Sequence, residues 1–123
     1  MLIDDEIAIL SVTESFLKRL GYDVSVYSDS EEALSAIHEN PQKYDMIITD
    51  YSMPKISGLA VIKSMKEKMI DVPVILMSGY IDVITEEKIK DYGVEKILTK
   101  PISVYELSDT VNKILKSNGI ADP

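Results

Sequence analysis

The sequence contains no cysteine, which excludes disulfide bonds and thiolate chemistry. No apolar run approaches the roughly 20 residues needed to cross a bilayer, and no basic stretch followed by an apolar one opens the chain. Basic residues are also few, because 13 of them stand against 21 acidic residues for a formal charge of −8. Such a surface repels DNA and anionic lipid. We therefore expect a cytoplasmic protein without membrane insertion or direct nucleic-acid binding.

What is present is a regular alternation of apolar segments. The 123 residues suit one domain, and an apolar fraction of 46% is enough to fill a single core. Short apolar runs with strand character alternate with segments whose apolar residues recur at helical spacing. This alternation predicts an α/β fold of the flavodoxin-like type, a (βα)5 chain doubly wound around a five-stranded parallel sheet. The expected strands are residues 1–3, 24–27, 46–49, 73–77 and 97–99.

The predicted helices lie between these strands and are bounded by capping residues and helix breakers. Apolar residues at helical spacing define the first helix: Ile9, Val12, Phe16 and Leu20. Met65 and Met69 share the apolar face of the third helix, and we expect both in the core. The boundary signals are Gly21 after the first helix, Pro41 after the second, Gly58 opening the third, Thr85 capping the fourth, and the Ser103–Glu106 capping box of the last.

Polar side chains stand at the ends of four of the five expected strands. They are Asp4 and Asp5 after the first strand, Asp50 after the third, Ser78 after the fourth and Lys100 after the fifth. In a doubly wound parallel sheet, ligands bind outside the carboxyl ends of the strands, where strand order reverses. Each residue alone is better explained as a turn former, a cap or an exposed loop residue. Together, at one edge of the sheet, they favour a common functional site.

The residue types at this edge indicate phosphoryl transfer. Three carboxylates close together repel one another unless a cation lies among them. Oxygen ligands with no histidine or cysteine nearby favour Mg²⁺ over zinc, with Mn²⁺ as the second candidate. The Lys100 ammonium and the Ser78 hydroxyl then suit the equatorial oxygens of a phosphoryl group in transfer.

These residues, in this order, resemble the CheY-like receiver domain of response regulators, the phosphoacceptor module of two-component signalling. The matching segments span almost the whole chain and are Asp4–Glu6, Asp50–Pro54 with Gly58, Met77–Gly79 and Thr99–Pro101. The resemblance implies that Asp50 accepts the phosphoryl group. It also implies that Lys100 pairs with Asp50 and then with the phosphoryl oxygens, and that Ser78 moves toward the bound phosphate.

A metal site is also implied by the resemblance. Asp5 and Asp50 would ligate Mg²⁺ directly, together with the backbone carbonyl of Ser52. Asp4 would hold the ion more remotely, through water.

Four further positions matter within the resemblance. Receivers usually carry Tyr or Phe three residues before the lysine, and here that position is Ile97. An aromatic rotamer switch is therefore excluded, and the switch residues would be Ser78 and Ile97. Family members tune hydrolysis of the phosphoryl group at the positions of Ser52 and Tyr80, and we expect Tyr80 to shield the anhydride from water. The peptide bond before Pro101 would be cis.

The implied phosphoryl donor is a phosphohistidine on a histidine kinase or a histidine phosphotransfer domain. The chain would modify itself and would not be a turnover enzyme. One alternative is a receiver-like module that docks partners without phosphorylation, but such a module would not need the complete polar set at the sheet edge. An aspartyl-phosphate phosphatase would need a second aspartate at Ser52, and flavodoxin-like nucleotide binding would need a glycine-rich loop after the first strand.

The first expected strand has only three residues before Asp4, which is shorter than a typical strand. We therefore expect that this strand is truncated and that residues 1–123, a single receiver domain, were excised from a longer chain. The sequences at 78–80 and 97–100 favour a hybrid histidine kinase as the parent, with a stand-alone or multidomain regulator as the alternatives.

Overall fold

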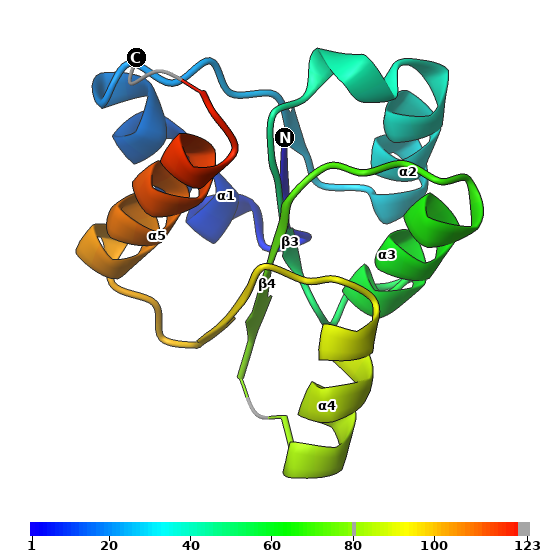
Figure 1. The fold of residues 1–123 in the computed structure, drawn as a ribbon. Helices are drawn as coiled ribbons and strands as arrows, with labels where there is room; N and C mark the ends of the chain where they lie inside the picture. The colour runs from blue at the N-terminus through cyan, green and yellow to red at the C-terminus, as the bar shows by residue number, and fades with distance from the viewer. Residues whose placement is uncertain (80, 121–123) are drawn as a thin grey trace.

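The structure is a computed structural model that describes residues 1–79 and 81–120. Strands and helices alternate along the chain (Figure 1), and each strand lies within two residues of its predicted range. The strands are β1 (Leu2–Ile3), β2 (Val26–Tyr27), β3 (Ile47–Asp50), β4 (Val74–Ser78) and β5 (Lys96–Thr99). The helices are α1 (Ile7–Arg19), α2 (Ser30–Glu39), the 3₁₀ helix η1 (Pro41–Lys43), α3 (Gly58–Glu67), α4 (Val83–Asp91) and α5 (Val104–Ser117).

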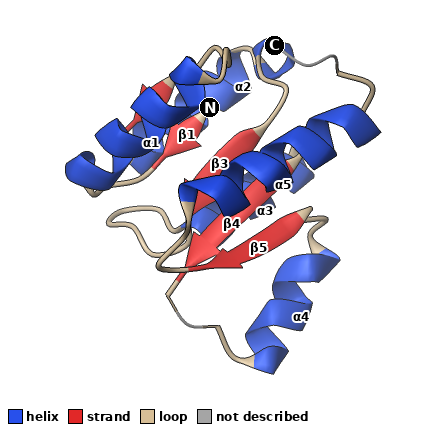
Figure 2. Cartoon of the chain, turned by 90° about the vertical axis from the view of Figure 1, so that its left-hand side faces the viewer, coloured by secondary structure: helices blue, strands red, loops and turns tan. Residues whose placement is uncertain are grey.

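The five strands form one parallel sheet in the order β2-β1-β3-β4-β5. The chain starts in β1, moves to one edge for β2 and then continues with β3 on the other side of β1. Strand order therefore reverses between β1 and β3. Helices α1 and α5 cover one face of the sheet, and α2, α3 and α4 cover the other (Figures 1 and 2). The predicted doubly wound (βα)5 fold is confirmed.

Strand β4 shows how the sequence fills both layers, because all five of its residues are buried. Side chains alternate between the two faces of a strand. Ile75 and Met77 pack in the core beneath α1 and α5. Val74 and Leu76 pack in the core beneath α2, α3 and α4. Burying each such side chain contributes roughly 1.5–3 kcal/mol to the stability of the fold. Because both faces of this strand are covered, its sequence is a continuous apolar run.

The buried face of α1 differs from the face that the apolar spacing defined. Leu10 and Leu17 are the buried residues of this helix. Ile9 and Val12 of the predicted set are exposed, as is Leu20 just beyond the helix. The segment carries apolar residues on more than one side, so spacing alone does not select the side that packs.

Two local predictions at helix ends are wrong. Met69 is 91% exposed with a φ of 57°, because α3 has already ended at Glu67, and only Met65 lies in the core. The N-cap of α4 is Asp82 and not Thr85, since the Asp82 carboxylate accepts the Thr85 N–H at 2.7 Å. Within the described part of the chain, no helix combines the length and the apolar character of a membrane span.

Candidate functional site

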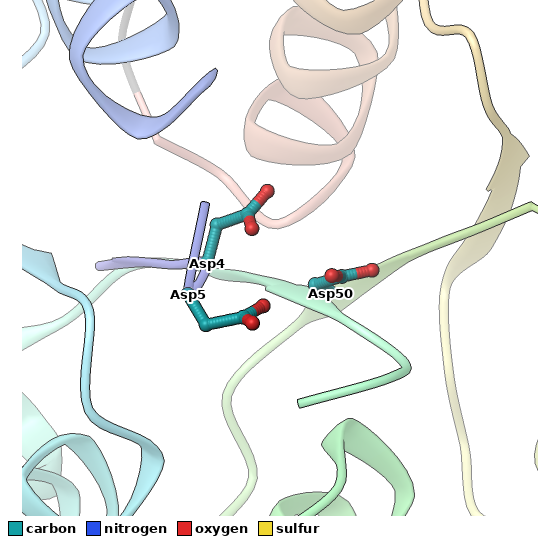
Figure 3. Close-up of side chains that lie close together, drawn as sticks. All are labelled: Asp4, Asp5 and Asp50. Carbon is teal, nitrogen blue, oxygen red and sulfur yellow. The ribbon is translucent and has the colours of Figure 1, made fainter. Parts of the chain in front are cut away.

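The acidic residues predicted at the strand ends lie together at one edge of the sheet. Asp4 and Asp5 directly follow β1, and Asp50 is the last residue of β3. One carboxylate oxygen of each lies within 4.8 Å of the others, and Figure 3 shows the three side chains where the two strands end. Parallel strands bring their carboxyl ends to the same edge, and the reversal between β1 and β3 brings these two ends side by side.

Lys100, the residue after β5, faces these carboxylates. Its Nζ lies 3.1 Å from Asp50 Oδ1, 3.8 Å from Glu6 Oε1 and 3.9 Å from Asp4 Oδ2. Burial disfavours the ammonium form, but the hydrogen bond to Asp50 and the surrounding negative charges outweigh it and raise the pKa of Lys100 above its usual value. The lysine is therefore a fixed positive charge beside Asp50 at neutral pH.

Asp4 is 1% exposed and incompletely hydrogen bonded. Its Oδ1 accepts the Glu6 N–H at 2.9 Å, whereas its Oδ2 has no hydrogen-bond partner among the described residues. Burial raises the pKa of Asp4 against the lowering effects of the Glu6 N–H and of Lys100. A buried carboxylate oxygen of this kind is costly unless a positive partner satisfies it.

The donor set suits a hard divalent cation. Among the described residues it consists of the carboxylates of Asp4, Asp5 and Asp50, and oxygen ligands favour magnesium-like ions over zinc. The one histidine of the sequence, His38, lies on α2, where its Nε2 is 3.1 Å from the Ser64 Oγ of α3. The residues present therefore fit the kind of metal that the sequence predicted.

The backbone of Asp50 is closely packed. Gly58, the first residue of α3, lies against the Asp50 carbonyl, and a Cβ at position 58 would overlap that oxygen. The Tyr51 N–H donates to the Met77 carbonyl, and the Gly58 N–H donates to the Tyr51 carbonyl, both at 2.8 Å. This close approach requires glycine at position 58.

Ser78 ends β4 and is 6% exposed. A cavity of about 70 Å³ lies beside it and is lined by Ser78, Ile81, Glu86, Ile97 and Thr99. The two residues predicted to act as a switch thus share one cavity, with a carboxylate from α4 in its wall.

The remaining predicted positions are Ser52, Tyr80 and Pro101. Ser52 is exposed in the loop between β3 and α3, and the Lys100–Pro101 peptide bond is cis, as the resemblance implies. Tyr80 lies outside the described residues, so its shielding role stays a prediction. Glu6 was not predicted to act at the edge, and its place directly after the acidic pair was the signal that could have indicated it.

A family model described as the response regulator receiver domain matches residues 1–112. This chain belongs to that family. Receiver domains of this kind are signalling modules of two-component systems, so the function predicted from the sequence is confirmed at that level.

Curated relatives extend the comparison. Over its whole length the receiver domain is 31% identical to the alkaline phosphatase synthesis transcriptional regulatory protein PhoP of Bacillus subtilis, and it covers 50% of that protein. Over 94% of the chain it is 30% identical to the two-component response regulator ARR12 of Arabidopsis thaliana, of which it covers 19%. The receiver domain therefore spans half or less of these two relatives.

Solved structures confirm the CheY-like fold. A response regulator receiver domain protein from Clostridium thermocellum matches with a TM-score of 0.87 and 30% identity, covering 96% of this chain and 94% of that one. The receiver domain of the Francisella response regulator 1452 matches with a TM-score of 0.88 and 31% identity, covering 95% of each chain.

Proposed function

We propose that this receiver domain accepts a phosphoryl group on Asp50 and changes conformation in response. The observation that carries the proposal is the 3.1 Å ion pair between Lys100 Nζ and Asp50 Oδ1. It joins the ends of β3 and β5 beside two further carboxylates. An ammonium fixed there can neutralise the negative charge that arrives with a phosphoryl group, without reorganising when the group is transferred.

In the proposed transfer, one Asp50 carboxylate oxygen forms a bond to phosphorus as the bond from phosphorus to the donor nitrogen breaks. The leaving imidazole nitrogen keeps the electron pair of the broken bond. Lys100 then pairs with one phosphoryl oxygen, and the Ser78 hydroxyl donates a hydrogen bond to another. The product is an aspartyl phosphate that adds about two negative charges to the edge of the sheet.

Asp5, Asp50 and the backbone carbonyl of Ser52 would hold Mg²⁺, or alternatively Mn²⁺, with Asp4 reaching it through water. Bound there, the ion would neutralise the carboxylates and stabilise negative charge on the transferred group. Two features support this choice: the all-carboxylate donor set, and the Asp4 Oδ2 that lacks a hydrogen-bond partner in the described part of the chain.

The donor would be a phosphohistidine on a histidine kinase or a histidine phosphotransfer domain, and the domain would not turn over an external substrate. Ser78 and Ile97 would act as the switch, an assignment supported by the cavity that both line. The tuning roles of Ser52 and Tyr80, the cytoplasmic location and the excision from a longer chain stay predictions.

Labelling with acetyl phosphate in the presence of Mg²⁺ tests the proposal. Intact-protein mass spectrometry should show the addition of one phosphoryl group. Asp50→Asn should abolish it, because the amide is not a nucleophile. Asp45→Asn is the matched control, since it makes the same change at an exposed aspartate just before β3, and it should label like the wild type. Wild-type labelling of Asp50→Asn would contradict the assignment.

A further inference from the structure

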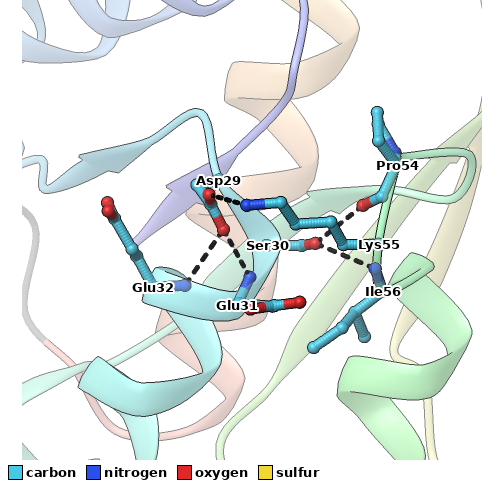
Figure 4. A network of polar contacts seen from close by, with 7 residues as sticks. All are labelled: Asp29, Ser30, Glu31, Glu32, Pro54, Lys55 and Ile56. Atoms are coloured by element: carbon cyan, nitrogen blue, oxygen red, sulfur yellow. Dashed lines mark hydrogen bonds and ion pairs between the residues drawn. The ribbon is translucent and has the colours of Figure 1, made fainter.

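Ser30, the first residue of α2, is a buried polar residue outside the carboxylate cluster, with 3% of its surface exposed. Its hydroxyl donates to the Pro54 carbonyl at 3.1 Å and accepts the Ile56 N–H at 3.2 Å (Figure 4). These partners lie 24 and 26 residues further along the chain, in the loop between β3 and α3. One hydroxyl thus ties α2 to the loop that follows Asp50.

The two partners of Ser30 are the two ends of one tight turn. The Ile56 N–H also donates to the Pro54 carbonyl at 2.8 Å, and Lys55 between them has a φ of 68°. A positive φ is unfavourable for a residue with a side chain, so the turn persists only where its surroundings hold it. Ser30 binds both ends of the turn, and Lys55 Nζ lies 2.7 Å from Asp29 Oδ2.

Asp29 is itself fixed, because it caps α2. Its Oδ1 accepts the N–H groups of Glu31 and Glu32 at 2.9 and 3.3 Å (Figure 4). The ion pair between Asp29 and Lys55 is more exposed than the part-buried Ser30 contacts, so we expect it to contribute less. The N-terminus of α2 is therefore a firm support for the turn.

The supported turn lies next to the segment that would complete a metal site. The backbone hydrogen bonds of Tyr51 hold the start of the loop, and Ser30 holds Pro54. Between these two fixed points stand only Ser52 and Met53. The Ser52 carbonyl thus lies between two residues that are held by hydrogen bonds, and one of the two is held by α2.

We propose that Ser30 is a positioning residue for Mg²⁺, which fixes the Ser52 backbone carbonyl by clamping the Pro54–Ile56 turn. This inference rests on the proposed function, since it requires Mg²⁺ at the Asp50 cluster. Residues that orient metal ligands without touching the ion typically change its affinity by roughly 10–100-fold when they are removed. Ser30 would act in this way through the backbone of the loop.

Ser30→Ala removes the clamp and leaves every carboxylate in place. Calorimetric titration with MgCl₂ should give a Kd about tenfold higher than that of the wild type. Acetyl phosphate labelling at saturating Mg²⁺ should change little, because Asp50 and Lys100 are intact. In metal-free protein, amide hydrogen exchange of residues 51–57 should be faster. A purely structural role would lower the melting temperature and leave the Mg²⁺ Kd unchanged.

Two further variants make the result specific. Ser64→Ala is the matched control, because it removes a hydroxyl from a contact between α2 and α3 that does not involve the loop, and it should keep the wild-type Kd. Lys55→Ala removes the partly exposed pair to Asp29 and should raise the Kd by only about twofold.

The outcomes separate this inference from the function on which it rests. Wild-type protein that binds Mg²⁺, with Ser30→Ala folded and binding equally well, overturns the role of Ser30 and leaves the phosphoacceptor assignment intact. Wild-type protein that binds no Mg²⁺ overturns the proposed metal site, and the role of Ser30 with it.

Discussion

The carboxyl edge of the sheet and the interior just behind it are built from opposite kinds of residue. At the edge, the described residues bring three carboxylates to one ammonium, and Asp4 keeps a buried oxygen without a hydrogen-bond partner there. In the interior, β3 and β4 bury apolar side chains in two layers, and apart from Asp50 and Ser78 at their ends Thr49 is the polar exception. Repulsion between the carboxylates makes the edge unfavourable for stability but suited to binding positive or reactive groups. The apolar interior supplies the stability that offsets this repulsion.

The largest effect is expected when the Lys100 ammonium is removed from the edge of the sheet. Lys100→Ala should slow acetyl phosphate labelling of Asp50 by roughly 10²–10³-fold, the usual cost of losing a group that stabilises the transferred charge. Mg²⁺ binding should persist, because the carboxylates remain. Intact-protein mass spectrometry gives the rate, and calorimetry gives the Mg²⁺ affinity.

Lys113→Ala is the control for that change, because Lys113 is an exposed lysine paired with Asp109 on α5. It should label at the wild-type rate. A Lys100→Ala protein that labels as fast as this control would show that the ammonium takes no part in transfer.

A second change acts on the interior. Ile75 is 0% exposed in the middle of β4, so Ile75→Ala should lower the free energy of unfolding by about 2–5 kcal/mol in urea denaturation. Ile7→Ala, at a residue 69% exposed, should change it by less than about 0.5 kcal/mol. Under native conditions both should label at Asp50 like the wild type. Loss of labelling in a still-folded Ile75→Ala protein would refute the division between edge and interior.

The smallest expected effect is at Asp4. Burial raises the pKa of Asp4 above its ordinary value of 3.8, so the folded protein binds this proton more tightly than the unfolded chain. The resulting stability is fully present below the unfolded pKa and is lost as the pH rises through the higher folded pKa. Asp4→Asn removes that loss and should raise the free energy of unfolding of metal-free protein at neutral pH by about 1 kcal/mol.

Urea denaturation in EDTA across the acidic to neutral range measures the Asp4 effect. The gap between Asp4→Asn and the wild type should widen from acidic to neutral pH, and added Mg²⁺ should shrink it by stabilising the wild type. If Asp4→Asn and the wild type are equally stable at neutral pH without metal, the charge of Asp4 does not destabilise the folded protein.

The edge could be predicted from the sequence because its geometry follows from topology. Continuous apolar runs identified β3 and β4, and parallel strands must end at the same edge, so Asp50, Lys100 and the acidic pair had to converge. Those predictions needed the order of the elements and not the details of packing.

Features that depend on neighbouring elements could not be predicted in this way. The segment of α1 has apolar residues on several sides, and only its contacts select Leu10 and Leu17. Met69 continues the helical spacing of α3, but the backbone leaves the helix with no glycine or proline to indicate it. The Ser30 contacts join residues 24 and 26 positions apart and exist only once the loop is folded.

The contact between Gly58 and the Asp50 carbonyl has a mechanical consequence. There is no room for even a methyl group between α3 and the end of β3, so that flank is stiff. Beside Ser78 and Ile97, by contrast, about 70 Å³ is open, so that flank is compliant. We therefore expect a force that acts on the Asp50 side chain to displace β4 and β5 and to leave α3 in its position.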